Sequence, residues 1–98
     1  MNIAENILDQ LGGRRFIAMT GASCFADYGD AISFKLPSRF ALQGINFVKV
    51  RLTARDLSDI QFGQVRGKTF QVVEEREDLG WEDLQPVFTA VTGLDTHL

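Results

Sequence analysis

The sequence predicts a single α+β domain, with one antiparallel sheet of about five strands that carries an N-terminal and a C-terminal helix on the same face. Three observations predict this class. Apolar residues recur at helical spacing at both ends of the chain, the middle alternates apolar and polar residues, and no helical pattern separates the expected strands. Strands that follow one another directly are normally antiparallel. The 98 residues suffice for one core, so we expect one domain over residues 1–98.

The first expected element is a short amphipathic helix over residues 3–11. Asn2 can cap it, and Glu5 stands three residues later in a capping-box relation. Apolar side chains then recur at helical spacing until Gly12, which supplies a left-handed stop. From residue 15 the period changes to two, so the run RFIAMT predicts the first strand.

Three further segments predict the rest of the sheet. The run ISFKL alternates after a Gly-Asp turn, and INFVKVRLTA shows the clearest alternation in the chain. The segment 59–76 predicts a hairpin that turns at residues 66–68. Gly63, within the first arm of this hairpin, indicates a bulge or a close approach of the backbone.

The chain is expected to close with a helix that starts near residue 82. Its apolar face is formed by Trp81, Leu84, Phe88 and Val91. Gly93 stands where a helix terminator is expected, and Leu94 can pack back on the last turn. Pro86 then falls in or near the first turn, where its missing N–H has no helical partner to lose.

The stretch RRFIAMTGASCFADYG has the outline of a strand followed by a phosphate-binding loop. Thr20 and Gly21 match the start of the TGxxxGxG pattern of short-chain dehydrogenases, but Phe25 and Asp27 stand where that pattern has glycine. A ring and a negative charge would then lie beside the phosphate, and no helix is expected to follow. We therefore expect a strand end with a tight bend at Gly21, and no nucleotide cofactor.

No catalytic or metal site is expected. The only histidine, His97, is the penultimate residue, where chain ends usually fray, so it is poorly placed for a hydrolytic triad. The only cysteine, Cys24, has no disulfide partner and cannot build a zinc cluster. The acidic residues do not match an EF-hand loop. We expect a protein that is not an enzyme and that needs no cofactor or metal.

Composition and apolar runs indicate a folded protein outside the membrane. The chain is 45% hydrophobic and 23% charged, which is ordinary for a globular domain. No apolar run approaches the ~20 residues that a membrane span requires. The N-terminal segment lacks the basic start and the apolar stretch of a signal peptide, so we expect a cytoplasmic location.

The net charge of −3 conceals two ends of opposite sign. Residues 1–73 carry nine Lys or Arg against six Asp or Glu, whereas residues 74–98 carry Arg76 against seven Asp or Glu. The acidic candidates for partner binding are Glu74, Glu75, Glu77, Asp78, Glu82 and Asp83. Two interpretations stay open. These side chains form a solvated hairpin end and helix start, or they imitate a run of phosphates and bind a basic groove on another protein.

The basic residues fall on the polar phase of the expected strands, so several of them share the outward face of the sheet. The candidates for nucleic-acid binding are Lys35, Arg39, Phe40, Phe47, Lys49, Arg51 and Arg55. The alternatives are an ordinary solvated face or a patch for a phosphate backbone or an acidic protein. Aromatic side chains interleaved with the basic ones would favour single-stranded nucleic acid.

The run LGGRRFIAMTGASCF resembles a family of small accessory proteins of bacteriophages, prophages and conjugative elements, whose members share an LGGxxF[IV]AMTGAxxF motif. The similarity continues through ISFKLP, INFVKVRL, DLSDIQFGQVRG and LQPVFTAVTGL, and so covers nearly the whole chain. Where members have an Ala-Lys-Asn-Phe turn, this chain has Ala-Ser-Cys-Phe at residues 22–25, without the basic residue. The resemblance implies a genomic context but no reaction and no binding residues.

The leading hypothesis is therefore a non-enzymatic accessory protein of a phage or mobile element in the cytoplasm of a bacterial host. It would act by contact with a host or phage protein, for example a component of a host defence system. The alternative is a nucleic-acid-binding module that uses the basic outer face of the sheet. The sequence also leaves open a homodimer through that face or through a strand edge.

Overall fold

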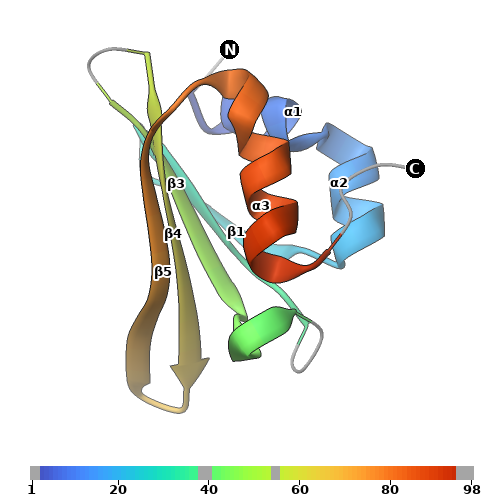
Figure 1. Ribbon diagram of the computed structural model, residues 1–98, viewed down its shortest axis with the longest axis vertical. Helices are drawn as coiled ribbons and strands as arrows, with labels where there is room; N and C mark the ends of the chain where they lie inside the picture. The colour runs from blue at the N-terminus through green and yellow to red at the C-terminus, as the bar shows by residue number, and fades with distance from the viewer. Residues whose placement is uncertain (1–2, 38–40, 54–55, 95–98) are drawn as a thin grey trace.

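The structure is a computed structural model that describes residues 3–37, 41–53 and 56–94 (Figure 1). Along the chain the main elements are α1 (Ile3–Leu11), α2 (Gly13–Thr20), β1 (Ser23–Asp27), β2 (Ala31–Lys35), β3 (Phe47–Leu52), β4 (Ser58–Arg66), β5 (Thr69–Leu79) and α3 (Leu84–Thr92). Two short 3-10 helices, η1 (Leu42–Gly44) and η2 (Trp81–Asp83), precede β3 and α3. The predicted α+β class is confirmed.

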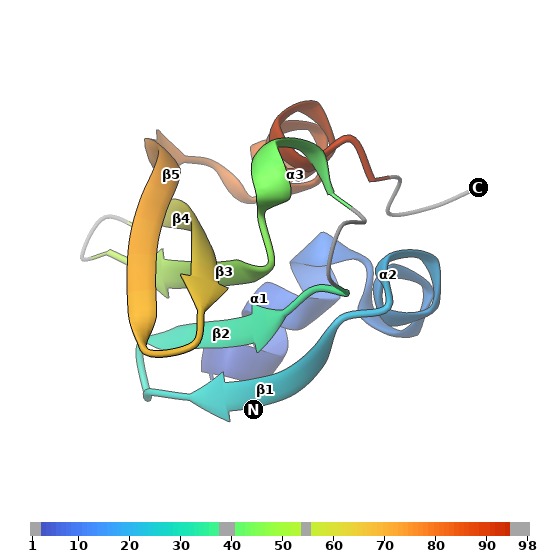
Figure 2. The ribbon, with the colours of Figure 1, turned by 90° about the horizontal axis from the view of Figure 1, so that it is seen from below.

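The five strands form one antiparallel sheet in the order β1-β2-β3-β4-β5, so every strand pairs with its neighbour in sequence. Figure 2 shows that α1, α2 and α3 all lie on one side of this sheet. The other side carries no helix from the described part of the chain. The β4–β5 hairpin reaches beyond the rest of the sheet, as seen at the bottom of Figure 1.

The prediction of a strand at RFIAMT is wrong, because these residues belong to the helix α2. The first strand is instead β1, which begins three residues after α2 ends. Phe16 and Thr20 are buried, whereas Ala18 between them is exposed. In a strand all three side chains would lie on the same face, so this burial pattern is that of a helix. Gly21 ends the helix in the left-handed conformation, with φ 72°.

The core lies between the helices and the sheet and is built around aromatic rings. The ring of Phe16 on α2 packs edge-on against Phe34 of β2 and Phe88 of α3, with centroid distances of 5.3 and 5.1 Å. Such edge-to-face pairs add to the stability that burial of the rings supplies. Phe62 of β4 completes the cluster at 6.3 Å from Phe88. One aromatic side chain from each of four elements therefore ties the two layers together.

The two edge strands are both irregular. The register of β1 against β2 shifts between Ser23 and Ala26, and Cys24 in this bulge has φ 55°. The register of β5 against β4 shifts twice, once beside Gly63 and once near Asp78, which also has φ 55°. The predicted irregularity at Gly63 is confirmed. Bulges at an edge hinder the addition of a foreign strand.

The closing helix begins later than expected. Trp81 lies in η2 and is 65% exposed, so its expected place on the apolar face is wrong. The other three residues of that face are buried, Gly93 ends α3 at φ 76°, and Leu94 packs on the core as predicted. Gln85 donates a hydrogen bond of 2.8 Å to the carbonyl oxygen of Leu11 and so joins α3 to the end of α1.

Candidate functional site

The side of the sheet that carries no helix is called the outer face below. Its central rows come from β3, β4 and β5, whose outward residues are Phe47, Lys49, Arg51, Asp59, Gln61, Gly63, Val72 and Glu75. Val48 and Val50, which alternate with the β3 residues, are fully buried on the helix side. The alternation predicted for INFVKVRLTA therefore places its polar residues on the outer face, as expected.

A groove of about 210 Å³ runs over β4 on the outer face. Its charged and polar lining consists of Lys49, Arg51, Asp59, Gln61, Glu75, Arg76 and Glu77. Lys49 and Arg51 from β3 form one wall. The opposite wall comes from β5 and carries Glu75, Glu77 and Arg76, whose guanidinium is paired with Glu74. The groove is therefore basic along β3 and net acidic along β5.

The floor of the groove is low because the side chains of β4 are engaged by β5. The Asp59 carboxylate accepts a hydrogen bond of 3.0 Å from the backbone N–H of Asp78, and the Gln61 amide donates one of 2.8 Å to Glu75. Both side chains lean along the sheet instead of standing away from it.

Tyr28, in the turn between β1 and β2, folds over the outer face. Its hydroxyl lies 3.1 Å from the hydroxyl of Ser33, which is only 2% exposed, so the two form a hydrogen bond. The ammonium nitrogen of Lys49 stands 4.5 Å from the centre of the Tyr28 ring, within cation–π range. These contacts hold Lys49 in place at the basic wall.

An aromatic pair occupies the other end of the outer face. Phe47 and Phe70 lie edge to face, with centroids 5.4 Å apart. The ring of Phe70 covers Gly63, where an added Cβ would come within 2.6 Å of it. Phe70 and Val72 beside it are 47% and 40% exposed. The outer face thus combines an apolar end with a charged groove.

The structure brings four of the candidate nucleic-acid-binding residues onto one face. Lys35, Phe47, Lys49 and Arg51 are neighbours on the paired strands β2 and β3. Arg51 has carboxylates nearby, because it lies 3.9 Å from Asp30 and directly across from Asp59. The remaining candidates, Arg39, Phe40 and Arg55, lie outside the described residues.

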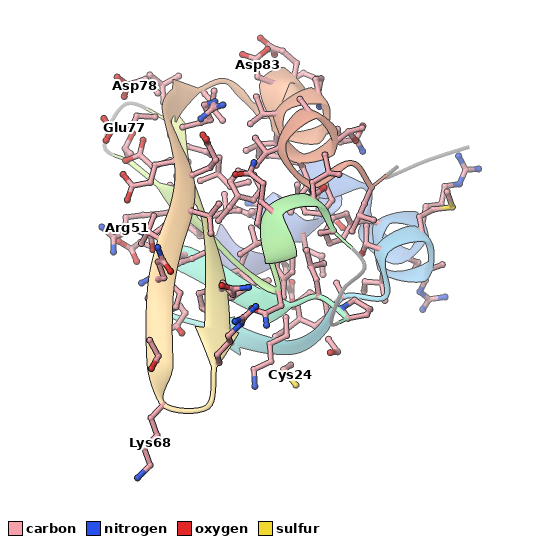
Figure 3. All side chains as sticks on the ribbon, turned by 60° about the horizontal axis from the view of Figure 1, so that its bottom comes forward. Cys24, Arg51, Lys68, Glu77, Asp78 and Asp83 are labelled. Carbon is pink, nitrogen blue, oxygen red and sulfur yellow. The ribbon has the colours of Figure 1, made fainter. Side chains whose placement is uncertain are left out.

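The six candidate acidic residues do not form one surface. Glu74 pairs with Arg76, whereas Glu75 and Glu77 face the groove. Figure 3 shows Glu77 and Asp78 at the end of the sheet and Asp83 apart from them at the start of α3. The expected continuous run of carboxylates is therefore divided between the groove and the connection from β5 to α3.

This connection, residues 78–83, is called the acidic corner below. It carries Asp78, Glu82 and Asp83 together with Trp81, which has the most exposed large apolar side chain among the described residues. Sequence analysis missed Trp81 as a surface residue, because spacings of three and four residues place it in phase with Leu84 and Phe88. Its position just after Gly80 and before two carboxylates is the only signal that favours a turn.

Within the described ranges, no three His, Cys, Asp or Glu side chains gather closely enough to hold a metal ion. Cys24 is exposed at the bulge of β1, and His97 lies outside those ranges. No described helix is both long and apolar enough to cross a membrane. The chain was also compared with protein-family models, with curated proteins and with solved structures, and none of them matches it.

Proposed function

We propose that this protein is a non-enzymatic accessory protein that acts by protein–protein contact, with the acidic corner as its contact surface. The observation that carries the proposal is the 65% exposure of Trp81. Tryptophan is the residue most enriched among those that dominate the binding energy of interfaces. An indole left in water by the fold is available to fill a pocket on a partner.

The backbone that carries Trp81 is held in place before any partner arrives. Its short helix η2 is anchored by Leu84, which is fully buried, and by Leu79, which packs against the core. The backbone N–H of Asp83 donates a hydrogen bond of 2.9 Å to the carbonyl oxygen of Gly80, across the residue that carries the indole. A preordered anchor loses little conformational entropy on binding, which favours affinity.

The charges around Trp81 define the chemistry of the partner. The carboxylates of Glu82 and Asp83 lie 3.2 and 3.7 Å from the position that a Cβ on Gly80 would take, so both stand close to the turn that presents the indole. A partner with an apolar pocket inside a basic rim complements this surface. Complementary charge mainly accelerates association and excludes acidic partners.

The motif LGGRRFIAMTGASCF supports a phage or mobile-element setting, in the cytoplasm of a bacterial host. A partner in that setting is a host or phage protein. A component of a host defence system is one such target. This context rests on the resemblance of the motif alone, and it determines which lysate to test first.

The test is a tagged pull-down from bacterial host lysate, with and without nuclease, read by mass spectrometry. The wild-type protein is compared with Trp81→Ala and with the charge-neutralised pair Glu82→Gln and Asp83→Asn. Phe70→Ala, which removes an exposed aromatic ring from the distant hairpin, is the matched control. We expect a protein partner that survives nuclease, that the control retains and that both corner variants lose. Capture of the same proteins by Trp81→Ala would contradict the proposal.

A second candidate function is single-stranded nucleic acid binding at the outer face. It is favoured by the stack of Lys49 on Tyr28 and by the Phe47–Phe70 pair, since bases stack on aromatic rings beside basic residues. Anisotropy of labelled oligo-dT and oligo-U would then report binding that weakens steeply as salt rises. Lys49→Ala should reduce it, whereas Arg14→Ala on α2, in the helix layer, should not. Absent or salt-independent binding contradicts this candidate.

A further inference from the structure

We infer that the outer face is the dimer interface of this protein: it packs against the outer face of a second copy, around a two-fold axis parallel to β4. The inference goes beyond the proposed function, because it concerns a different surface. It rests on how charge and apolar area are distributed on the two strands that flank β4.

The register of the sheet places β3 and β5 on either side of β4 in rows of paired residues. In one row Phe47 pairs with Gly63, which pairs with Val72. In the next row Lys49 pairs with Gln61, which pairs with Glu75. The third row begins with Arg51 and Asp59, and Glu77 lines the groove from the β5 side.

Each row therefore has complementary ends. The β3 side carries Phe47, Lys49 and Arg51, and the β5 side carries Val72, Glu75 and Glu77. Arg76 also lines the groove from β5, but its charge is paired with that of Glu74.

A two-fold axis parallel to β4 exchanges these two sides when two outer faces meet. Lys49 of one copy then faces Glu75 of the other, Arg51 faces Glu77, and Phe47 faces Val72. Each contact occurs twice because the interface is isologous. The two rows defined across all three strands match without a shift of register. Arg51 and Glu77 line opposite walls of the same groove, so the charges of the face are complementary to themselves.

The groove leaves room for these contacts. Asp59 and Gln61 are turned toward β5 by their hydrogen bonds, which keeps the residues nearest the axis low. The cavity of about 210 Å³ above them leaves space along the axis between the two copies, so the walls on either side can meet. Charged residues in such a wet, polar interface set which partner binds and in which register.

Other occupants fit this face less well. A nucleic acid strand would meet the carboxylates of Glu75 and Glu77 a short distance from the basic wall. A uniformly acidic or uniformly basic protein would be repelled by one wall of the groove. A second copy offers both signs in the required arrangement, and the bulged edges of β1 and β5 leave the face as the favourable route of self-association.

The test uses two charge-reversal variants of the full chain and measures mass by sedimentation equilibrium. In the first variant, Lys49→Glu with Arg51→Glu, both walls are acidic. In the second, Glu75→Lys with Glu77→Lys, both walls are basic. We expect the wild type to have about twice its chain mass of 10.9 kDa. The dimer dissociation constant of each variant should be roughly 100-fold higher than that of the wild type.

The decisive sample is an equimolar mixture of the two variants. Each wall then faces a wall of opposite sign, so we expect a heterodimer where neither variant alone dimerises. This recovery also shows that both variants are folded, which circular dichroism checks separately. Arg14→Glu with Arg15→Glu on α2 reverses two exposed charges in the helix layer and should leave the wild-type dimer unchanged.

Three outcomes would overturn the inference. They are a wild type that is monomeric at millimolar concentration, charge-reversal variants that dimerise as well as the wild type, and a mixture that stays monomeric. A monomer whose outer face instead binds an oligonucleotide or a lysate protein would overturn it too. Trp81→Ala should leave the dimer intact, so failure here and failure of the proposed function are separate results.

Discussion

The side-chain amide of Asn46 satisfies both backbone groups of Val65. Its Nδ2 donates to the Val65 carbonyl oxygen at 2.9 Å, and its Oδ1 accepts from the Val65 N–H at 2.7 Å. β3 begins only at Phe47, whereas β4 continues to Arg66. The amide therefore replaces the backbone pairing that the shorter strand no longer provides. It secures the base of the projecting hairpin.

Replacing Asn46 by alanine should destabilise the fold by about 2 kcal/mol, because two hydrogen bonds are lost and the groups of Val65 are partly buried. Urea denaturation measures the change in the free energy of unfolding. Asn6→Ala, at an exposed position of α1, is the control and should change it by less than about 0.5 kcal/mol. Equal effects of the two substitutions would show that the amide bridge contributes nothing.

Gly63→Ala should displace the ring of Phe70, because the new methyl group would stand 2.6 Å from it and 3.1 Å from the carbonyl oxygen of Gln71. We expect a loss of about 1–3 kcal/mol, as is typical of overpacking. In the background of Phe70→Ala the same substitution should cost less, since only the backbone contact remains. Thermal unfolding of the four proteins of this cycle measures the coupling. Additive effects would contradict the close approach.

The hydrogen bond between Tyr28 and Ser33 should contribute about 1 kcal/mol, because the serine hydroxyl is buried and has this partner in the turn. Tyr28→Phe removes the phenolic hydroxyl but keeps the ring over Lys49. In a Ser33→Ala background, Tyr28→Phe should have almost no effect on the free energy of unfolding. A double-mutant cycle by urea denaturation gives the interaction directly. A coupling energy near zero would count against the bond.

Trp81 is the only tryptophan, so fluorescence reports on the acidic corner alone. We expect efficient quenching in the folded protein, with caesium ions more effective than iodide because Glu82 and Asp83 attract cations. The difference should shrink as salt is added, since the Debye length falls to about 8 Å at physiological ionic strength. The double substitution Glu82→Gln with Asp83→Asn should remove the difference between quenching by caesium and by iodide at low salt. Poor quenching by both ions would mean that the indole is covered.

Most of the fold follows from residue periodicity, and its one misplaced strand has a specific cause. Phe16 and Thr20 are four residues apart, a spacing that puts them on the same face of either a helix or a strand. The residue that distinguishes a helix from a strand here is Ala18, and alanine is common both in protein interiors and on protein surfaces. Tertiary packing decides the matter, because only a helix brings the Phe16 ring to Phe34 and Phe88.

The candidate site was predictable strand by strand but not across strands. Alternation correctly assigns Lys49 and Arg51 to the polar side of β3. Which side chains stand opposite them depends on register and on the bulges of β5, which no local pattern specifies. The meeting of the basic wall with Glu75 and Glu77 is for this reason visible only in three dimensions. Trp81 was misplaced because η2 has a shorter turn than the α-helix that follows it.

The strand order carries a consequence for how the chain folds. Because every strand pairs with its sequence neighbour, loop closure costs little, and such local topologies reach the native state quickly. During synthesis each hairpin can form as soon as its second strand emerges. The exceptions are the contacts of α3 with the first two helices. The hydrogen bond from Gln85 to Leu11 spans 74 residues, and the ring of Phe88 packs on that of Phe16. The packing of α1 on the sheet can therefore form early, whereas its contacts with α3 form only after α3 has been made.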